Sequence, residues 1–276
     1  MSLDALPPLR ESLAAHGLMA NKAFGQHFLL DLNITRKIVR LAELSPGDRV
    51  IEVGPGPGGL TRALLEAGAR VTAIEKDLRF QPLLRDLAEA AGPGALDLLF
   101  ADALEAHEAA LVGAGPAHVV SNLPYNVGTP LLIKWLTGPW RPASMTLMFQ
   151  KEVAERIAAR AGDDAYGRLA VIAQATSHAA SVMDIPARAF TPPPKVDSAV
   201  VRLTPRGDRP SPARLDALQA VTAAAFGQRR KMLRASLKAL GGEPLIEAAG
   251  LDPQARAETI DVAGFLRLAD GWLARR

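Results

Sequence analysis

Between residues 49 and 160, short apolar runs alternate with stretches in which apolar residues recur at helical spacing. The short runs predict strands and the helical spacing predicts helices. The predicted strands cover 49–53, 71–74, 96–100, 118–121 and 145–149, and the predicted helices cover 60–67 and 151–160. Strands that alternate with helices are typical of an α/β fold with a parallel sheet.

The pattern changes near residue 205. Residues 204–213 (TPRGDRPSPA) are polar and rich in proline, which predicts a linker. The residues after it are rich in alanine, leucine and charge, which predicts a small, all-helical domain. We therefore expect one domain over 1–205 and a second over 206–276. The sequence leaves open whether residues 1–20 are ordered on their own.

Polar residues and glycines follow the predicted strands. The glycine-rich loop follows 49–53, Glu75 follows 71–74, Asp102 follows 96–100, and Asn122 follows 118–121. Ligands of parallel sheets bind beyond the carboxyl ends of the strands. We expect these residues to converge on one site.

The loop EVGPGPGG (52–59) leads from a predicted strand into a predicted helix. Gly54, Gly56 and Gly59 match GxGxxG, a pattern that lets the backbone come close to a ligand. Glu75, 21 positions after Gly54, is placed to accept hydrogen bonds from both hydroxyls of a ribose, which fits NAD or S-adenosylmethionine equally. Asp102 is either an acceptor for an adenine amino group or the N-cap of a helix that begins near Ala103.

Asn122-Leu123-Pro124-Tyr125 holds an amide, a rigid proline and an aromatic ring. The Asn122 side-chain carbonyl and the Leu123 backbone carbonyl could accept both N–H groups of an adenine amine, with Pro124 restricting the backbone and Tyr125 stacking on the base. Transfer of a sulfonium methyl to such an amine needs orientation rather than a strong base. The alternative is that these residues form a tight turn for backbone reasons.

Composition excludes several other kinds of site. The chain has 276 residues, 49% of them apolar, and no cysteine, so thiolate zinc sites, disulfides and cysteine nucleophiles are excluded. No signal peptide or membrane-spanning run is recognisable, and we expect a cytoplasmic protein without membrane association and without a metal. The net charge of +3 does not by itself indicate a nucleic-acid partner.

At seven places in order, the chain resembles the rRNA adenine N6-dimethyltransferases. The matching segments are FGQHFLLD (24–31), EVGPGPGGLT (52–61), IEKD (74–77), ADAL (101–104), SNLPY (121–125), FQKEVAER (149–156) and FTPPPKVDSAV (190–200), followed by FGQRRKMLR (226–234). The resemblance implies a Rossmann-like methyltransferase domain with a small helical C-terminal domain, and S-adenosyl-L-methionine as cofactor. It also implies dimethylation of two neighbouring adenosines near the 3′ end of small-subunit rRNA within a pre-30S particle.

The resemblance also assigns roles to residues. It places Gly54, Gly56 and Leu29 on the cofactor, Glu75 on its ribose and Asp102 on its adenine. It places Asn122, with Leu123 and Pro124, at the methyl-transfer centre, where Asn122 also meets the cofactor.

The resemblance also assigns roles to two aromatic side chains, Tyr125 and Phe190. Tyr125 would stack on the target base, and Phe190 would cover its other face unless Phe190 is a core aromatic. The family usually has asparagine at the position of His27. We expect His27 to donate a hydrogen bond to the cofactor, with a purely structural role as the alternative.

Residues 226–242 contain five cations and no acid: Arg229, Arg230, Lys231, Arg234 and Lys238. On one helix Arg230, Arg234 and Lys238 would align, with Lys231 adjacent. Leu233, Leu237 and Leu240 would share the other side. Such a cationic face suits rRNA phosphates. An ordinary solvated helix is the alternative.

Three other functions remain open on the sequence alone. One is a related methyltransferase that modifies an adenine of large-subunit rRNA, and another is a catalytically silent assembly factor. An NAD dehydrogenase would need a hydride-transfer acid or base, which the sequence does not place. We expect a monomer that acts on small-subunit rRNA.

Overall fold

The computed structural model describes residues 3, 6–18, 20, 26–228 and 230–275. By contacts, the chain forms two compact units. The first comprises residues 1–132, 142–151 and 181–202, and the second comprises 133–141, 152–180 and 203–276. Each unit is described by itself below.

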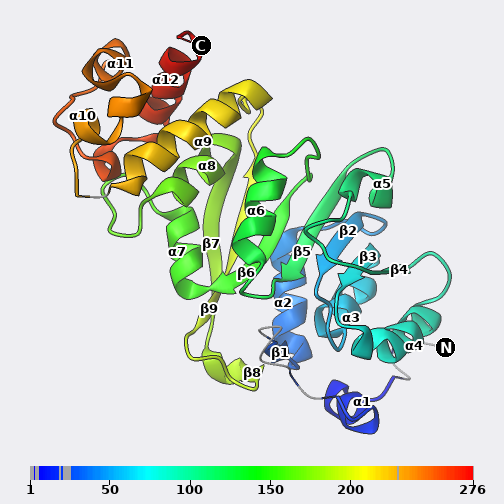
Figure 1. Cartoon of the computed structure of the whole chain (residues 1–276). Helices are drawn as coiled ribbons and strands as arrows, with labels where there is room; N and C mark the ends of the chain where they lie inside the picture. Colours follow the sequence, from blue (N-terminus) through cyan, green and yellow to red (C-terminus); the bar gives the residue numbers. More distant parts are fainter. Residues whose placement is uncertain (1–2, 4–5, 19, 21–25, 229, 276) are drawn as a thin grey trace. The chain divides into compact units, whose positions relative to one another are not determined.

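Within the described residues, seven strands form one sheet in the order β4-β3-β2-β5-β6-β9-β7 (Figure 1). Their bounds are β2 Arg49–Val53, β3 Arg70–Glu75, β4 Leu96–Phe100, β5 Ala117–Asn122, β6 Met145–Gln150, β7 Ser177–Ile185 and β9 Ser198–Pro205. The pairs β2–β3, β3–β4, β2–β5 and β5–β6 are parallel. All five predicted strands are confirmed, and so is the α/β fold class.

The centre of this sheet is covered on both faces, as expected for parallel strands. In β2, the neighbouring residues Val50 and Ile51 point to opposite faces and both are fully buried. Val50 packs with Val71 of β3 and with Ile38 and Leu64 from helices. The period-2 pattern of a half-exposed strand is therefore absent, because residues 50–53 of β2 are all buried.

The α-helices that precede β7 in the described chain are α1 Leu9–Ala15, α2 Leu32–Ala42, α3 Gly59–Glu66, α4 Gln81–Ala91, α5 Glu108–Val112, α6 Gly128–Thr137, α7 Lys151–Ala158 and α8 Arg168–Thr176. Asp31 caps α2, because its side chain accepts a hydrogen bond from the Asn33 N–H at 2.8 Å. Helix α1 lies in the segment whose order the sequence leaves open. It buries Leu9 and Leu13, and the Arg62 guanidinium donates to the Pro7 carbonyl at 2.8 Å.

A second, two-stranded sheet joins distant parts of the chain. Strand β1 (Phe28–Leu29) pairs antiparallel with β8 (Phe190–Thr191), so that Leu29 lies opposite Phe190. This pairing holds the segment around His27 next to the proline-rich segment that begins at Pro192.

The second unit is mostly helical. It contains α7 and α8 together with α9 Pro212–Gly227, α10 Leu233–Ser236, α11 Gly242–Ala248 and α12 Val262–Leu273. Its core contains Leu218, Val221 and Phe265 together with Tyr166 and Val171. The helical character predicted for 206–276 is confirmed. The chain does not divide at a single point, however, because this core also takes in residues that precede position 205.

Two features of the second unit differ from the sequence predictions. The segment between β9 and α9 is tied down rather than a bare linker, since the Arg209 guanidinium donates to the Leu136 carbonyl at 2.6 Å. The single helix predicted over 226–242 is wrong. Helix α9 ends at Gly227, Met232 forms a β-bridge with Arg256, and the Leu233 N–H donates to the Ala255 carbonyl. These backbone bonds compete with a continuous helix.

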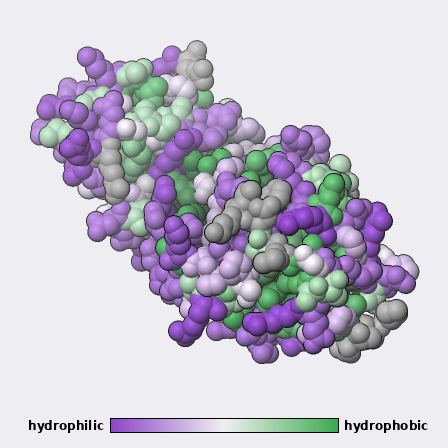
Figure 2. Space-filling model, turned by 60° about the horizontal axis from the view of Figure 1, so that its bottom comes forward, coloured by the Kyte–Doolittle hydropathy of each residue, from purple (hydrophilic) through white to green (hydrophobic). Residues whose placement is uncertain are grey.

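Figure 2 shows mostly hydrophilic residues on the face that it displays, with apolar residues gathered in patches between them. The large apolar residues that are exposed include Leu78, Val196 and Met232. Among the described residues, the helices are too short or too polar to cross a membrane.

Candidate active site

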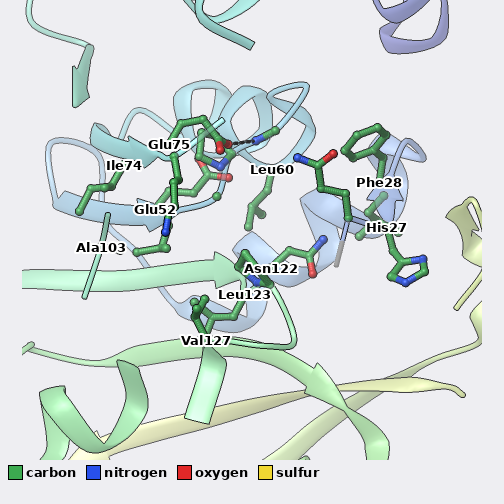
Figure 3. Close-up of a pocket in the computed structure, with 18 of the residues that line it drawn as sticks. His27, Phe28, Glu52, Leu60, Ile74, Glu75, Ala103, Asn122, Leu123 and Val127 are labelled. Carbon is green, nitrogen blue, oxygen red and sulfur yellow. Dashed lines mark hydrogen bonds between the residues drawn. The ribbon is translucent and has the colours of Figure 1, made fainter. Parts of the chain in front are cut away.

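A cavity of about 250 Å³ lies at the carboxyl ends of β2, β3 and β5. Its lining includes ten residues that the sequence assigns to the site: His27, Leu29, Gly54, Gly56, Glu75, Asp102, Asn122, Leu123, Pro124 and Tyr125. Figure 3 shows Glu75 and Asn122 reaching the cavity from different strands. The expected convergence is therefore present.

The glycines of the loop are required by backbone conformation and by space. Gly54 and Gly56 have φ values of +69° and +52°, which side chains rarely adopt. A Cβ atom at Gly54 would lie 3.1 Å from Pro124 Cγ, and one at Gly59 would lie 2.7 Å from the Leu29 carbonyl oxygen. The loop thus lets three segments approach one another around the cavity.

Glu75 is held by backbone donors at the edge of this loop. Its Oε2 accepts from the Gly56 N–H at 3.0 Å and its Oε1 accepts from the Asp77 N–H at 2.8 Å. The side chain is 6% exposed. Burial raises the pKa of Glu75, and the two backbone bonds oppose this rise. The result is an oriented carboxyl group in a small cavity.

Glu52 is a site residue that the sequence analysis misses. It lines the cavity, is 1% exposed, and its Oε2 accepts from the Thr61 hydroxyl at 2.6 Å. Burial raises the pKa of its carboxyl to about 8. The sequence feature that could have revealed Glu52 is the single acid in RVIEV, a run that otherwise has the pattern of a buried strand.

Asp102 caps a turn and not the helix predicted to begin near Ala103, while its role toward an adenine amino group stays a prediction. Its Oδ1 accepts from the Leu104 N–H at 2.9 Å, which caps a turn; the next helix, α5, begins at Glu108. Its Oδ2 accepts from the Lys76 ammonium at 2.8 Å, and both residues line the same cavity. The carboxylate therefore lies at the cavity with a fixed orientation.

The end of β5 and the turn after it are anchored on both sides of Asn122. The Ser121 hydroxyl donates to the Val53 carbonyl at 2.6 Å, and the Leu123 side chain is 1% exposed. The Pro124 carbonyl accepts from the Gly128 N–H at 3.0 Å, so the segment is also a turn that starts α6. Asn122 lies between these anchors with its amide in the cavity.

Tyr125 is fixed at both its hydroxyl and its ring. The hydroxyl is hydrogen-bonded to Ser198 Oγ at 2.7 Å, and the ring stacks with His27 at a centroid distance of 5.6 Å and an interplanar angle of 30°. Burial raises the pKa of Tyr125, so its hydroxyl is neutral at physiological pH. His27 Nδ1 lies 2.9 Å from the Pro192 carbonyl oxygen.

Phe190 lies in the hydrophobic core, which is the alternative location that the sequence leaves open for it. It is 3% exposed, pairs with Leu29 in the small sheet and packs in the same core cluster as Ile38 and Val200. The role predicted for Phe190, covering the second face of a base, stays a prediction. In this structure its ring is enclosed by apolar neighbours.

The predicted cationic segment is exposed although it is not a single helix. Arg230, Lys231 and Lys238 are exposed, whereas Leu233 and Leu237 are buried. Arg234 forms an ion pair with Glu243 at 3.8 Å. Arg229 lies outside the described residues. The cations are therefore exposed and the leucines Leu233 and Leu237 buried, although the segment is not the predicted single helix.

Comparison with known proteins gives a consistent result. A family model described as "Ribosomal RNA adenine dimethylase" matches residues 17–272. A protein of Phenylobacterium zucineum named "Ribosomal RNA small subunit methyltransferase A" is 78% identical over the whole chain and 96% of its own length. A protein of the same name from Mesorhizobium japonicum is 56% identical over 98% of this chain and 99% of its own length.

Two solved structures have the same fold. A dimethyladenosine transferase from Plasmodium falciparum matches with a TM-score of 0.73 and 27% identity, over 88% of this chain and 96% of its own. The 23S rRNA methyltransferase ErmE matches with a TM-score of 0.68 and 28% identity, over 88% of this chain and 98% of its own. The fold of this chain is thus one that these two proteins share.

Proposed function

The chain belongs to the ribosomal RNA adenine dimethylase family, and on that premise we propose that it dimethylates N6 of two adjacent adenosines near the 3′ end of small-subunit rRNA. The observation that carries this choice of subunit is the 78% identity, over the full chain, to a small-subunit methyltransferase. The identity to the large-subunit methyltransferase ErmE is 28%. We propose that the protein acts as a monomer on the pre-30S particle in the cytoplasm.

The cavity suits S-adenosyl-L-methionine, the cofactor of the family. Its glycine loop lines the cavity, and the glycines let the backbone itself approach a ligand. Glu75 is oriented to accept from two ribose hydroxyls, and Asp102 is oriented to accept from an adenine amino group. Leu29 would add an apolar contact from β1.

When bound, this cofactor supplies a methyl group attached to a positively charged sulfur, and the sulfur can leave without being protonated. The chain's own part is to position the nucleophile. Asn122 Oδ1 and the Leu123 carbonyl would accept the two N–H groups of the target amine, which turns its lone pair toward the methyl group. Tyr125 would hold the face of the base. The methylated amine nitrogen would be acidic, so its proton would pass to solvent without a side-chain base.

The test uses small subunits from cells that lack this modification. They are incubated with the purified protein and labelled S-adenosylmethionine, and the rRNA nucleosides are then analysed. The proposal requires labelled N6,N6-dimethyladenosine in the small-subunit rRNA. Label in large-subunit rRNA would select the other methyltransferase class, and cofactor binding without transfer would select a silent assembly factor.

A further inference from the structure

A second cavity, of about 780 Å³, lies within the helical unit and shares none of its described lining residues with the first cavity. Helix α7 contributes Glu152 and Arg156 to it, α8 contributes Arg168, and the last turn of α9 contributes Phe226. Glu152 and Arg156 belong to FQKEVAER (149–156), a motif none of whose residues lines the first cavity. The volume is within the range of roughly 300–1,000 Å³ that ligand sites have, so the cavity is large enough for a small-molecule ligand.

The charged groups of this cavity have both signs. Arg156 and Arg168 are exposed, and neither forms an ion pair with another described residue. Glu152 lies one helical turn before Arg156 and is likewise exposed without such a pair, and Asp164 adds a second acid to the lining. A bare anion would be attracted by the arginines and repelled by the acids. A ligand that joins an anionic group to N–H donors matches both signs.

One aromatic ring forms part of the wall. Phe226 is half-buried and packs against Phe265 with ring centroids 5.3 Å apart, and against the Tyr166 ring with centroids 6.0 Å apart. Tyr166 is 2% exposed, and its hydroxyl donates to the Ile260 carbonyl at 2.9 Å, so Tyr166 supports Phe226 rather than meeting a ligand. Phe226 is thus a ring held in place at the wall of the cavity, which is the kind of surface on which a base stacks.

We propose that this cavity holds one unpaired guanine nucleotide of the rRNA, with its phosphate on Arg156 and Arg168 and its base against Phe226. The guanidinium fork matches the oxygens of a phosphate. Guanine presents N1–H and N2–H side by side, which the carboxylate of Glu152 accepts together, whereas adenine and cytosine each offer one amino group. Stacking on an aromatic ring combined with hydrogen bonds to the base edge is how proteins recognise unpaired RNA bases.

The source of the nucleotide follows from the position of the cavity along the chain. Gly227, the last residue of α9, lines the cavity, and the exposed cations Arg230 and Lys231 follow directly after it in the sequence. An RNA strand whose phosphates lie on these cations would continue into the cavity, which a free nucleotide would not require. The inference rests on the proposed function, since the nucleotide belongs to the same small-subunit rRNA.

Three substitutions each alter one property of the cavity, and each has a control in the same unit at an exposed position that does not line it. The first fills space on α9, the second removes the charge of the carboxylate, and the third removes a phosphate contact. The pairs of variant and control are Ala223→Phe with Ala213→Phe, Glu152→Gln with Glu155→Gln, and Arg168→Ala with Arg160→Ala.

The test treats undermodified small subunits with kethoxal, a reagent for N1 and N2 of unpaired guanines, in the presence and absence of the protein. We expect the unsubstituted protein and the controls to protect a guanine that stays reactive with Ala223→Phe and with Glu152→Gln. Affinity for the particle should fall about tenfold in Ala223→Phe and Arg168→Ala, and less than about twofold in the controls. Glu152→Gln changes no volume, so it keeps the test decisive if Ala223→Phe disturbs α9.

Three outcomes would overturn the inference. A kethoxal pattern that is the same for the cavity variants and their controls would show that no guanine enters the cavity. Loss of protection at an adenine, a cytosine or a uracil alone would show that the base is not guanine. Binding of GMP to the free protein, together with unchanged affinity of the cavity variants for the particle, would assign the cavity to a free nucleotide. These are binding measurements that need no methyl transfer, so their failure is distinct from failure of the proposed function.

Discussion

Glu75 and Gly56 are joined by a hydrogen bond in which the Gly56 N–H donates to Glu75 Oε2 at 3.0 Å. The bond links the acid at the end of β3 to the glycine loop that follows β2. Since Oε1 accepts from Asp77 N–H as well, the carboxyl group is oriented before any ligand arrives. Orientation in advance lowers the entropic cost of binding.

We predict that Glu75→Ala weakens S-adenosylmethionine binding by at least about tenfold, the usual range for loss of hydrogen bonds to a charged acceptor. Calorimetric titration with the cofactor measures this directly. Glu89→Ala, an exposed acid on α4, is the control and should leave the Kd unchanged. Unchanged affinity in Glu75→Ala would refute the ribose assignment.

Gly54 lies against Pro124 at a distance that leaves no room for a side chain. Gly54→Ala should lower the free energy of unfolding by about 1–2 kcal/mol, because φ is +69° there. It should also impair methyl transfer, because the new Cβ, 3.1 Å from Pro124 Cγ, pushes on the segment that carries Asn122. Thermal unfolding and the transfer assay measure the two effects.

The control for this substitution is Gly47→Ala. Gly47 has φ of +88°, yet a Cβ atom there would meet nothing within 4 Å. The backbone strain should therefore be similar while activity is kept. Equal activity in the two variants would show that the close approach of Gly54 and Pro124 has no role in the reaction.

Asn122→Ala should leave the cofactor Kd within about twofold and lower the rate of methyl transfer by about 100-fold, the usual effect of losing alignment at a reacting centre. Asn33→Ala, an exposed asparagine of α2, serves as the control. Single-turnover transfer with labelled cofactor gives the rate. If cofactor binding fell instead, Asn122 would belong to the cofactor half of the site.

The features predicted well from the sequence are those fixed by local chemistry. The strand RVIEV and the loop after it are recognisable because apolar runs and glycines have strong local preferences. The acids and the amide fall at strand ends, and the parallel arrangement then brings them together without further information.

The features that the sequence does not reveal depend on contacts between distant segments. Nothing near Phe190 reveals that β8 pairs with β1, and it is this pairing that buries the ring. The cationic segment has a helical pattern, yet the Met232–Arg256 bridge interrupts it. The stacking of His27 on Tyr125 likewise depends on where three separate segments meet.

Glu52 predicts a pH dependence of stability. Its pKa is about 8 in the folded chain against an ordinary value of 4.5, because it is buried. Between these values the folded chain keeps a proton that the unfolded chain has released, so raising the pH favours unfolding. The stability contributed by the protonated Glu52 is complete below about pH 4.5 and is lost as the pH rises to about 8. Within this window the free energy of unfolding falls by up to roughly 1.4 kcal/mol per pH unit.

Glu52→Gln should remove this part of the slope, because the amide does not titrate and can still accept from Thr61. Denaturant unfolding between pH 5 and pH 8 measures the difference from the unsubstituted protein, at intervals of about one pH unit. Glu89→Gln is the control and should keep the slope. Parallel stability curves for Glu52→Gln and the unsubstituted protein would show that Glu52 is ionised throughout.

The exposed cations after α9 predict a salt dependence of particle binding. Replacing Arg230, Lys231 and Lys238 by alanine should weaken binding to small subunits. The slope of log K against log salt should fall by about 0.7–0.9 for each rRNA phosphate that these side chains neutralise. Arg234→Ala should have less effect, because Glu243 lies 3.8 Å away and partly neutralises its charge.

Three exposed arginines of the first unit, Arg40, Arg70 and Arg85, provide a control with the same change in net charge. If the segment after α9 binds rRNA, the control should alter the slope less than the substitution of Arg230, Lys231 and Lys238 does. Equal slopes would mean that net charge, and not this segment, governs attraction to the particle. Cofactor affinity should be unchanged in both variants, because neither set of residues lines the cavity.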